Sequence, residues 1–232
     1  MTDTTGLLAL LQLADSQFPA GTFAHSYGLE QLARDGRVRD ALTLEAFVRS
    51  VTHSQSASSD ARAAAAVARA ADSDSLAEVC AIDAALFRIK GAEELRTAST
   101  ATGTRLLHEV AIHESGQSGL ILEYFEAVRS GRTPGTHPVA FAVAGAALGV
   151  DAEAIVSALL LGTASVILSA SMRLLPVSHR DVQATLHRLR PEIALLAREA
   201  VEDAAAPFAS FHPLQEIAAM RHRTARVRLF AS

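Results

Sequence analysis

The stretch that decides the fold is AIVSALLLGTASVILSASM, residues 154–172, which contains no charged side chain. Its length would permit a membrane span, but serine and threonine interrupt it, and its charged flanks lack the aromatic residues typical of membrane interfaces. Small side chains recur along it at helical spacing, which lets another helix approach closely. We therefore expect a buried central helix rather than a membrane helix. The small residues are Ala154, Ala158, Gly162, Ser165 and Ser169.

Outward from this stretch, apolar residues recur with helical spacing, and the alternation typical of strands is nearly absent. The pattern predicts helices over residues 7–14 and 23–35 and a third that begins near Thr43. The serine-rich residues 54–61 predict a break or a solvent-exposed shoulder in the chain. The chain of 232 residues shows no domain linker. It is predicted to be all-α, a single-domain bundle over residues 1–232 with roughly ten helices around the buried central helix.

The bulk composition excludes some functions and compartments. The formal net charge is −4, so composition gives no support to a nucleic-acid partner, because nucleic-acid binders are more often basic. Cys80 is the only cysteine, which excludes an internal disulfide and a cysteine-based zinc site within one chain. The N-terminus carries an acid where a signal peptide would carry basic residues. We expect a cytoplasmic protein that binds neither nucleic acid nor membrane.

No local signature of an enzyme is found in the sequence. A phosphate-binding loop needs a lysine after a glycine-rich turn, and the single lysine, Lys90, has no such turn before it. In the segment HEVAIHE, His108 and His113 are five positions apart, about 140° around a helix, whereas zinc-binding histidines on one helix are four apart. This spacing does not favour a zinc site. A helical metallohydrolase that uses these histidines with Glu109 or Glu114 is kept as the alternative interpretation. A helical regulator that binds a small molecule is a third, but we find no helix-turn-helix pattern.

A second informative stretch is DSQFPAGTFAHSYGLEQL, residues 15–32, here named the opening stretch. Its aromatic rings, Phe18 among them, can simply cover the core, or the stretch can form a polar and aromatic contact surface for another protein. Helical spacing would pair Glu30 with Arg34. Gly28 is costly inside a helix and predicts that another element packs closely against it. The candidate contact residues of this stretch are Phe23, His25, Ser26, Tyr27 and Glu30.

The last residues, MRHRTARVRLFAS, positions 220–232, are named the tail. They carry four arginines and no acidic residue and end near an apolar Leu229-Phe230 pair. A basic tail can be merely solvated or can hold an acidic partner. The apolar tip favours docking, either onto the protein's own body or onto another protein, over plain disorder.

Four stretches, in order, resemble the UreF family of urease accessory proteins. The resemblance covers nearly the whole chain. One departure is Arg223, which stands where the family usually has an acid after the histidine. The stretches are LLALLQLADSQFPAGTFAHSYGLEQL (7–32), EELRTASTATGTRLL (93–107), HPVAFAVAGAALGV (137–150) with SASMRLLPVSHRDVQATLHRLRP (169–191), and PLQEIAAMRHRTARVRLFAS (213–232).

The resemblance implies an all-helical protein, usually a homodimer, without catalysis of its own. It would bridge the accessory protein UreD, also called UreH, and the GTPase UreG during nickel insertion into the urease apoprotein, and would influence GTP hydrolysis. Nickel and GTP are expected on those partners, so no cofactor and no metal site is expected in this chain. Residues 1–20 and 220–232 are implied as partner-docking extensions. The implied partner contacts are Phe23, His25, Ser26, Tyr27, Glu30, Arg173, Gln183, Met220, His222, Arg228, Leu229 and Phe230, and the implied turn residues are Pro19, Gly21, Gly28 and Pro176.

Overall fold

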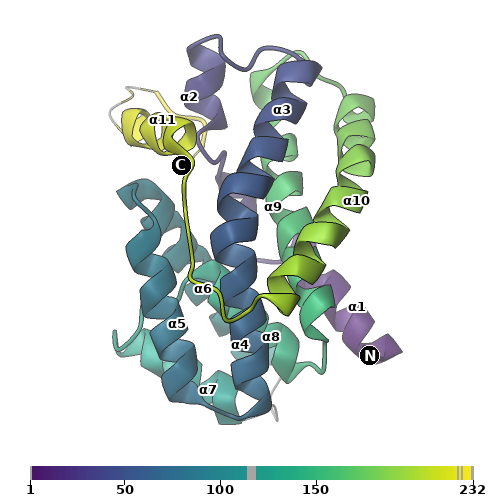
Figure 1. Cartoon of the computed structure of the whole chain (residues 1–232). Coiled ribbons are helices and arrows are strands. Elements are labelled where there is room, and N and C mark those ends of the chain that lie inside the picture. Colours follow the sequence, from purple (N-terminus) through teal and green to yellow (C-terminus); the bar gives the residue numbers. More distant parts are fainter. Residues whose placement is uncertain (1, 114–118, 224, 226, 231–232) are drawn as a thin grey trace.

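The computed structural model describes residues 2–113, 119–223, 225 and 227–230. These residues form eleven α-helices, one 3-10 turn and one π-helix, and no strand (Figure 1). The all-α, single-domain prediction is confirmed. The elements are α1 (Thr4–Leu13), η1 (the 3-10 turn, Thr22–Ala24), α2 (Leu29–Arg34), α3 (Ala41–Val51), η2 (the π-helix, Thr52–Ala61), α4 (Arg62–Asp72), α5 (Leu76–Ile89), α6 (Glu93–His113), α7 (Gly119–Arg129), α8 (His137–Ala147), α9 (Ala152–Leu174), α10 (His179–Glu202) and α11 (Pro213–Arg223).

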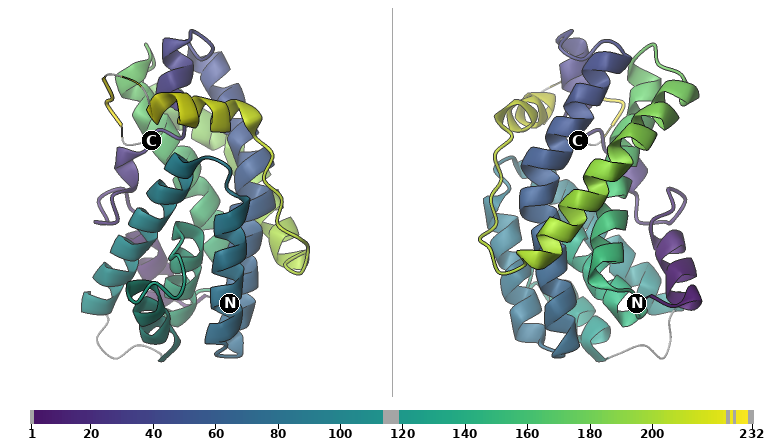
Figure 2. Two further views of the ribbon diagram at one scale, coloured as in Figure 1. Left: turned by 90° about the vertical axis from the view of Figure 1, so that its left-hand side faces the viewer. Right: turned by 45° about the vertical axis from the view of Figure 1, so that its right-hand side comes forward.

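The predicted central helix is α9. It begins after Asp151, whose carboxylate accepts a hydrogen bond from the Ala154 N–H at 3.0 Å, as an N-cap does. Helices α8, α10 and α4 pack along it, and its inward side chains, such as Leu160 and Ile167, are fully buried. In the described part of the chain, it is the one helix long and apolar enough to cross a membrane. However, 56% of its most apolar 18-residue segment is buried inside the protein. Other helices pack around it (Figure 2). Helix α9 is therefore the buried core helix of the bundle, as predicted.

Helices α3, η2 and α4 follow one another without interruption and form one long rod (Figure 1). The break or solvent-exposed shoulder predicted at residues 54–61 is therefore wrong, because the rod is continuous there and none of these residues is exposed. The hydroxyls of Thr52, Ser58 and Ser59 each donate to a backbone carbonyl four residues earlier, at 2.6–2.9 Å. Such bonds compete with the ordinary helical ones, and the rod continues here as a wider π-helix, a form that is frequent at functional sites.

The opening stretch does not form the single helix predicted over residues 23–35. After η1 the chain has two consecutive left-handed residues, Tyr27 with φ 55° and Gly28 with φ 85°. Left-handed residues end a right-handed helix, so the remaining helix, α2, is short. The close packing expected at Gly28 is supplied by α11, because a Cβ added there would lie 3.2 Å from the Gln215 carbonyl oxygen.

Helix α11 crosses the end of the bundle beside α2 and α6 (Figure 2). It begins at Pro213, where a proline is well tolerated because the first helical N–H has no helical acceptor. Ala219 joins a small apolar cluster with Ala92 and Leu95, separate from the main core. Beyond α11 the chain returns toward α2 and buries Phe230. The C-terminal segment and the opening stretch, far apart in sequence, thus meet at one place.

Candidate functional site

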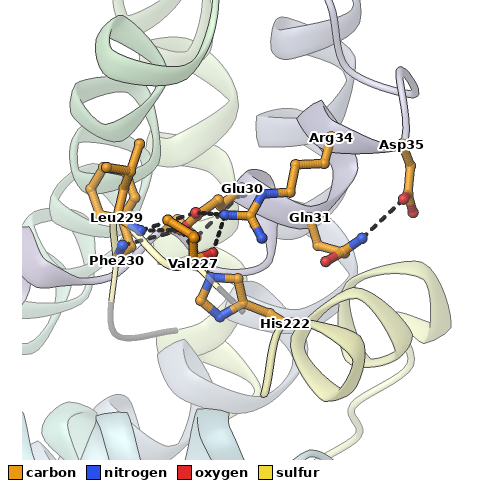
Figure 3. A network of polar contacts seen from close by, with 9 residues as sticks. Glu30, Gln31, Arg34, Asp35, His222, Val227, Leu229 and Phe230 are labelled. Carbon is orange, nitrogen blue, oxygen red and sulfur yellow. Dashed lines mark hydrogen bonds and ion pairs between the residues drawn. The ribbon is translucent and has the colours of Figure 1, made fainter. Parts of the chain in front are cut away.

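The two segments meet around the carboxylate of Glu30 (Figure 3). Glu30 is 1% exposed, and its oxygens accept the backbone N–H of Leu229 at 3.0 Å and that of Phe230 at 3.1 Å. The Nε2 of His222 lies 2.8 Å from one oxygen, and the guanidinium of Arg34 lies 2.5 Å from the other. A carboxylate is acceptor-only, so all four groups donate to it. We name this set of residues the Glu30 network.

The network keeps the buried carboxylate charged. Burial alone raises the pKa of Glu30, but the hydrogen bonds from the Leu229 amide, from His222 and from the Phe230 amide outweigh burial and lower it. An isolated buried charge would be costly, whereas hydrogen bonds to an ionised acceptor are about twice as strong as neutral ones. Glu30 therefore acts as a fixed anionic anchor for the tail.

Other residues of α2 extend this attachment. Arg34 also donates to the backbone carbonyl of Val227. At the far end of α2, Asp35 accepts from Gln31 at 2.9 Å (Figure 3). Asp35 also accepts from Arg221 of α11 at 2.6 Å. Helix α2 thus holds both α11 and the residues that follow it. The Arg34–Glu30 pairing predicted from helical spacing is present, and it connects to the tail as well.

The aromatic tip of the tail is attached to the central helix. Phe230 is 6% exposed, and the guanidinium carbon of Arg173, near the end of α9, lies 5.0 Å from the centroid of its ring. A cation over an aromatic face at this distance is attractive. Together with the Glu30 network, this contact fixes the tail to both α2 and α9.

The candidate contact residues are buried, exposed or, in the case of Tyr27, half-buried. Of the buried residues, Glu30, His222 and Phe230 belong to the Glu30 network, and Ser26 contacts the backbone of Glu30. The exposed residues are spread over several elements. Gln183 lies on α10 and takes no part in the network. The buried group is His25, Ser26, Glu30, His222 and Phe230; Tyr27 is half-buried; and the exposed group is Phe23, Arg173, Gln183, Met220, Arg228 and Leu229.

Phe23 lies beside an apolar groove of about 90 Å³. The groove is formed by the end of α1, the opening stretch, α8 and α9, and the small residues Ala158 and Gly162 line its floor. The stripe of small residues predicted to admit another helix therefore faces the opening stretch. Phe18 packs against the core, as the core-covering interpretation expects, while Phe23 is 66% exposed.

The turn residues and the family departure also have clear positions. Gly21 has φ 79° and lies against Arg105, whose guanidinium a Cβ would meet at 2.6 Å. Pro176 follows the end of α9 and precedes α10. Arg223, the charge reversal, pairs within the chain, with Glu93 at 2.7 Å and with Glu94 at 3.4 Å. The body of the protein thus supplies the acids that this arginine needs.

The His-Glu segment of α6 gives no metal centre in the described residues. His108 and His113 are exposed, and each lies near the carboxylate of Glu109, at 3.5 Å and 3.8 Å. Glu114, the other acid of the metallohydrolase interpretation, lies outside the described residues. No group of three metal-binding side chains is found among the residues that the structure describes. The geometry does not favour the metallohydrolase interpretation.

Sequence reasoning missed a second polar cluster beneath the opening stretch. Lys90 donates to Asp60 at 2.6 Å, and both side chains are nearly buried. The ring of His25 lies 3.3 Å from the Thr102 hydroxyl, and the same cavity is lined by His137. The only available signal was that Lys90 is the single lysine of the chain, and no helical spacing connects it to its partners.

Comparison with known proteins places the chain among urease accessory proteins. The UreF family profile matches residues 38–190. The chain is 35% identical over 226 residues to the urease accessory protein UreF of Photorhabdus laumondii, covering 97% of this chain and 98% of that protein. It is 36% identical over 225 residues to UreF 2 of Brucella abortus, covering 97% and 91%, and 34% identical over 230 residues to UreF of Yersinia enterocolitica, covering 99% and 100%. The residues of the Glu30 network lie on both sides of the range 38–190.

Proposed function

This chain belongs to the UreF family of urease accessory proteins, and we propose that it acts as a non-enzymatic, cytoplasmic scaffold. In this role it bridges UreD and the GTPase UreG, as a homodimer, during nickel insertion into the urease apoprotein, and it modulates GTP hydrolysis by UreG. Nickel and GTP are carried by the partners. Family membership supports the accessory role.

The observation that carries the proposal is that the tail is attached from within and that α11, which leads into it, carries exposed apolar side chains. The Glu30 network holds the backbone at Leu229 and Phe230. Along α11, Leu214, Ile217 and Met220 are 39–51% exposed at every third position. A held segment with exposed apolar side chains suits protein docking, because little conformational entropy is lost on binding.

This arrangement changes the role expected of the buried candidates. Glu30 and His222 cannot contact a partner while the tail is docked, since both are at most 1% exposed. We propose that they act indirectly, by fixing the tail. Met220, Arg228 and Leu229, which are exposed, are proposed to make the direct contacts.

The test is co-expression with UreD and UreG from the same organism, followed by size-exclusion chromatography with light scattering. The wild-type chain should co-elute with both partners in one assembly, and GTP hydrolysis by UreG should differ between the free and assembled states. Met220→Glu should prevent assembly, because it places a charge in an apolar contact. Leu122→Glu on α7 is the matched control, since Leu122 and Met220 are both 48% exposed. If the Met220 variant assembles as well as its control, α11 is not a docking surface.

A further inference from the structure

A small polar cavity of about 30 Å³ lies beneath the opening stretch, between η2, α6, α8 and α9. Its wall includes the Asp60–Lys90 ion pair and the side chains of His25, Tyr27 and His137. A lysine, an aspartate, two histidines and a tyrosine in one pocket resemble the titratable clusters of active sites. The size decides against that interpretation, since pockets for organic ligands measure about 300 Å³ or more.

Gln55, one of the residues that line the cavity, carries an acceptor that receives no hydrogen bond from the residues that the structure describes. Gln55 is 3% exposed, and its Oε1 has no donor among the described residues. Leaving such an atom without a hydrogen bond costs the full desolvation penalty of the group. A hydrogen-bond donor bound in the cavity would remove this penalty.

The π-helix places this acceptor beside the ion pair. Gln55 and Asp60 are five positions apart, and both line the cavity. In an α-helix residues five apart would diverge by about 140°, whereas the hydrogen bonds of a π-helix run to the fifth residue and bring such positions toward one side. The wider helix of η2 thus builds one wall of the cavity.

We propose that this cavity is an internal hydration site, in which a bound water donates to Gln55 Oε1 and links η2 to the opening stretch. The volume of about 30 Å³ exceeds the roughly 10–15 Å³ that one water requires. Water also has the donor and acceptor capacity that the lining demands, with hydroxyl and ring-nitrogen groups from several elements around it. This proposal does not depend on the proposed function.

The charges of the lining favour a neutral guest over an ion. Asp60 and Lys90 neutralise each other. Burial lowers the pKa of His137 to about 4, and burial followed by the charge of Arg105 lowers the pKa of His25. Both imidazoles are then neutral near pH 7, so the cavity offers no net charge to an anion or a cation.

The direct test is a crystal structure of the wild-type protein at a resolution that shows ordered water. A water within about 3.2 Å of Gln55 Oε1, with a further partner among the lining groups, is the expected result. If the cavity is dry, or Gln55 instead accepts from a protein donor, the proposal is overturned. This measurement does not depend on whether any variant folds.

Thermal unfolding of Gln55→Leu gives an independent test through the sign of its effect. If water occupies the site, removing its acceptor leaves the water and the polar lining unsatisfied, and the melting temperature should fall. If Oε1 is a dry, unsatisfied acceptor, its removal should raise the melting temperature. Gln183→Leu is the control, since Gln183 is exposed, and it should leave the melting temperature nearly unchanged. Gln55→Met provides a second apolar variant of similar length if the leucine variant does not fold.

Discussion

The two ends of the chain are attached to the body in different ways. At the N-terminal end, the backbone N–H and the hydroxyl of Thr2 donate to Asp151 at 2.9 Å and 2.6 Å, and Leu8 and Leu11 of α1 remain about 60% exposed. At the C-terminal end, the tail is held by the fully enclosed Glu30, and its Phe230 is buried. The first end leaves apolar side chains outside, whereas the second draws its aromatic tip inside.

The difference shows that an apolar chain end can either be available to another protein or be packed into its own fold. Exposed leucines on a helix whose other face, with Leu10 and Leu13, is buried in the core are available to another protein. An apolar tip whose backbone N–H groups are satisfied by a buried carboxylate is part of the protein's own structure. Both ends are proposed to take part in docking, but the C-terminal end keeps its aromatic tip buried while Leu229 beside it is 52% exposed.

The largest expected effect comes from removing the anchor of the C-terminal end. Glu30→Ala leaves two backbone N–H groups, His222 and Arg34 without their acceptor, and should cost about 3 kcal/mol of unfolding free energy, the lower range for breaking a buried pair. Urea unfolding measures the loss, and hydrogen exchange at Leu229 and Phe230 should report release of the tail.

The control for this change is Glu126→Ala on α7. Glu126 pairs with Arg129 at 3.0 Å, but both side chains are exposed, so breaking this pair should change the unfolding free energy much less than Glu30→Ala does. If the two variants lose equal stability, or the tail amides of Glu30→Ala stay protected, the Glu30 network does not hold the tail.

The next effect is the pH dependence of the same anchor. The pKa of Glu30 is lowered in the folded protein from its ordinary value of 4.5, so the network's stabilisation is complete above that value and is lost as the pH falls through the lowered value. The melting temperature of the wild type should exceed that of Glu30→Gln at neutral pH. This difference should shrink as the pH falls below about 4.5. A difference that stays constant to lower pH would show that the charge of Glu30 is not what holds the tail.

The sequence predicted the helical fold that carries both chain ends, but not the contacts that hold those ends. The charge-free run of α9 and the helical periodicity around it predicted an all-α bundle, because burial of apolar faces repeats along the chain. The contact between Glu30 and Phe230 spans 200 positions, and no local pattern reports such a pair. Sequence does not distinguish a buried candidate from an exposed one, so the buried Glu30 and the exposed Met220 were grouped together.

Local backbone geometry explains the remaining errors. The predicted second helix failed at Tyr27, because a left-handed conformation is uncommon outside glycine and apolar spacing carries no sign of it. The predicted break at residues 54–61 failed because serine-rich segments are typical of turns, whereas here their hydroxyls bond within the helix. Neither error changed the predicted fold class. Both errors gave wrong predicted positions to residues that line the polar cavity.

A smaller effect is expected from weakening the N-terminal attachment. Thr2→Val keeps the shape of the side chain but removes the hydroxyl that donates to Asp151 at 2.6 Å and accepts its backbone N–H at 3.0 Å. The loss should be about 1 kcal/mol, the net value of an ordinary hydrogen bond, as measured by urea unfolding. Thr2→Ser, which keeps the hydroxyl, is the control and should recover most of it. If Thr2→Val costs as much as Glu30→Ala, the two ends are equally tied to the fold.

The smallest effect on stability is expected at the exposed leucines of α1. Leu8 is 62% exposed, so Leu8→Glu should change the unfolding free energy by no more than about 0.5 kcal/mol. If residues 1–20 dock a partner as proposed, the same change should reduce recovery of the chain with UreD in a pull-down. Leu195→Glu on α10, where the leucine is 54% exposed, is the control and should retain binding. A stability loss in Leu8→Glu comparable to that in Glu30→Ala would mean that α1 is covered in the free protein, by a second copy or by its own chain. In that case both ends would be structural, and the docking surface would have to be sought on the outer side of α11 alone.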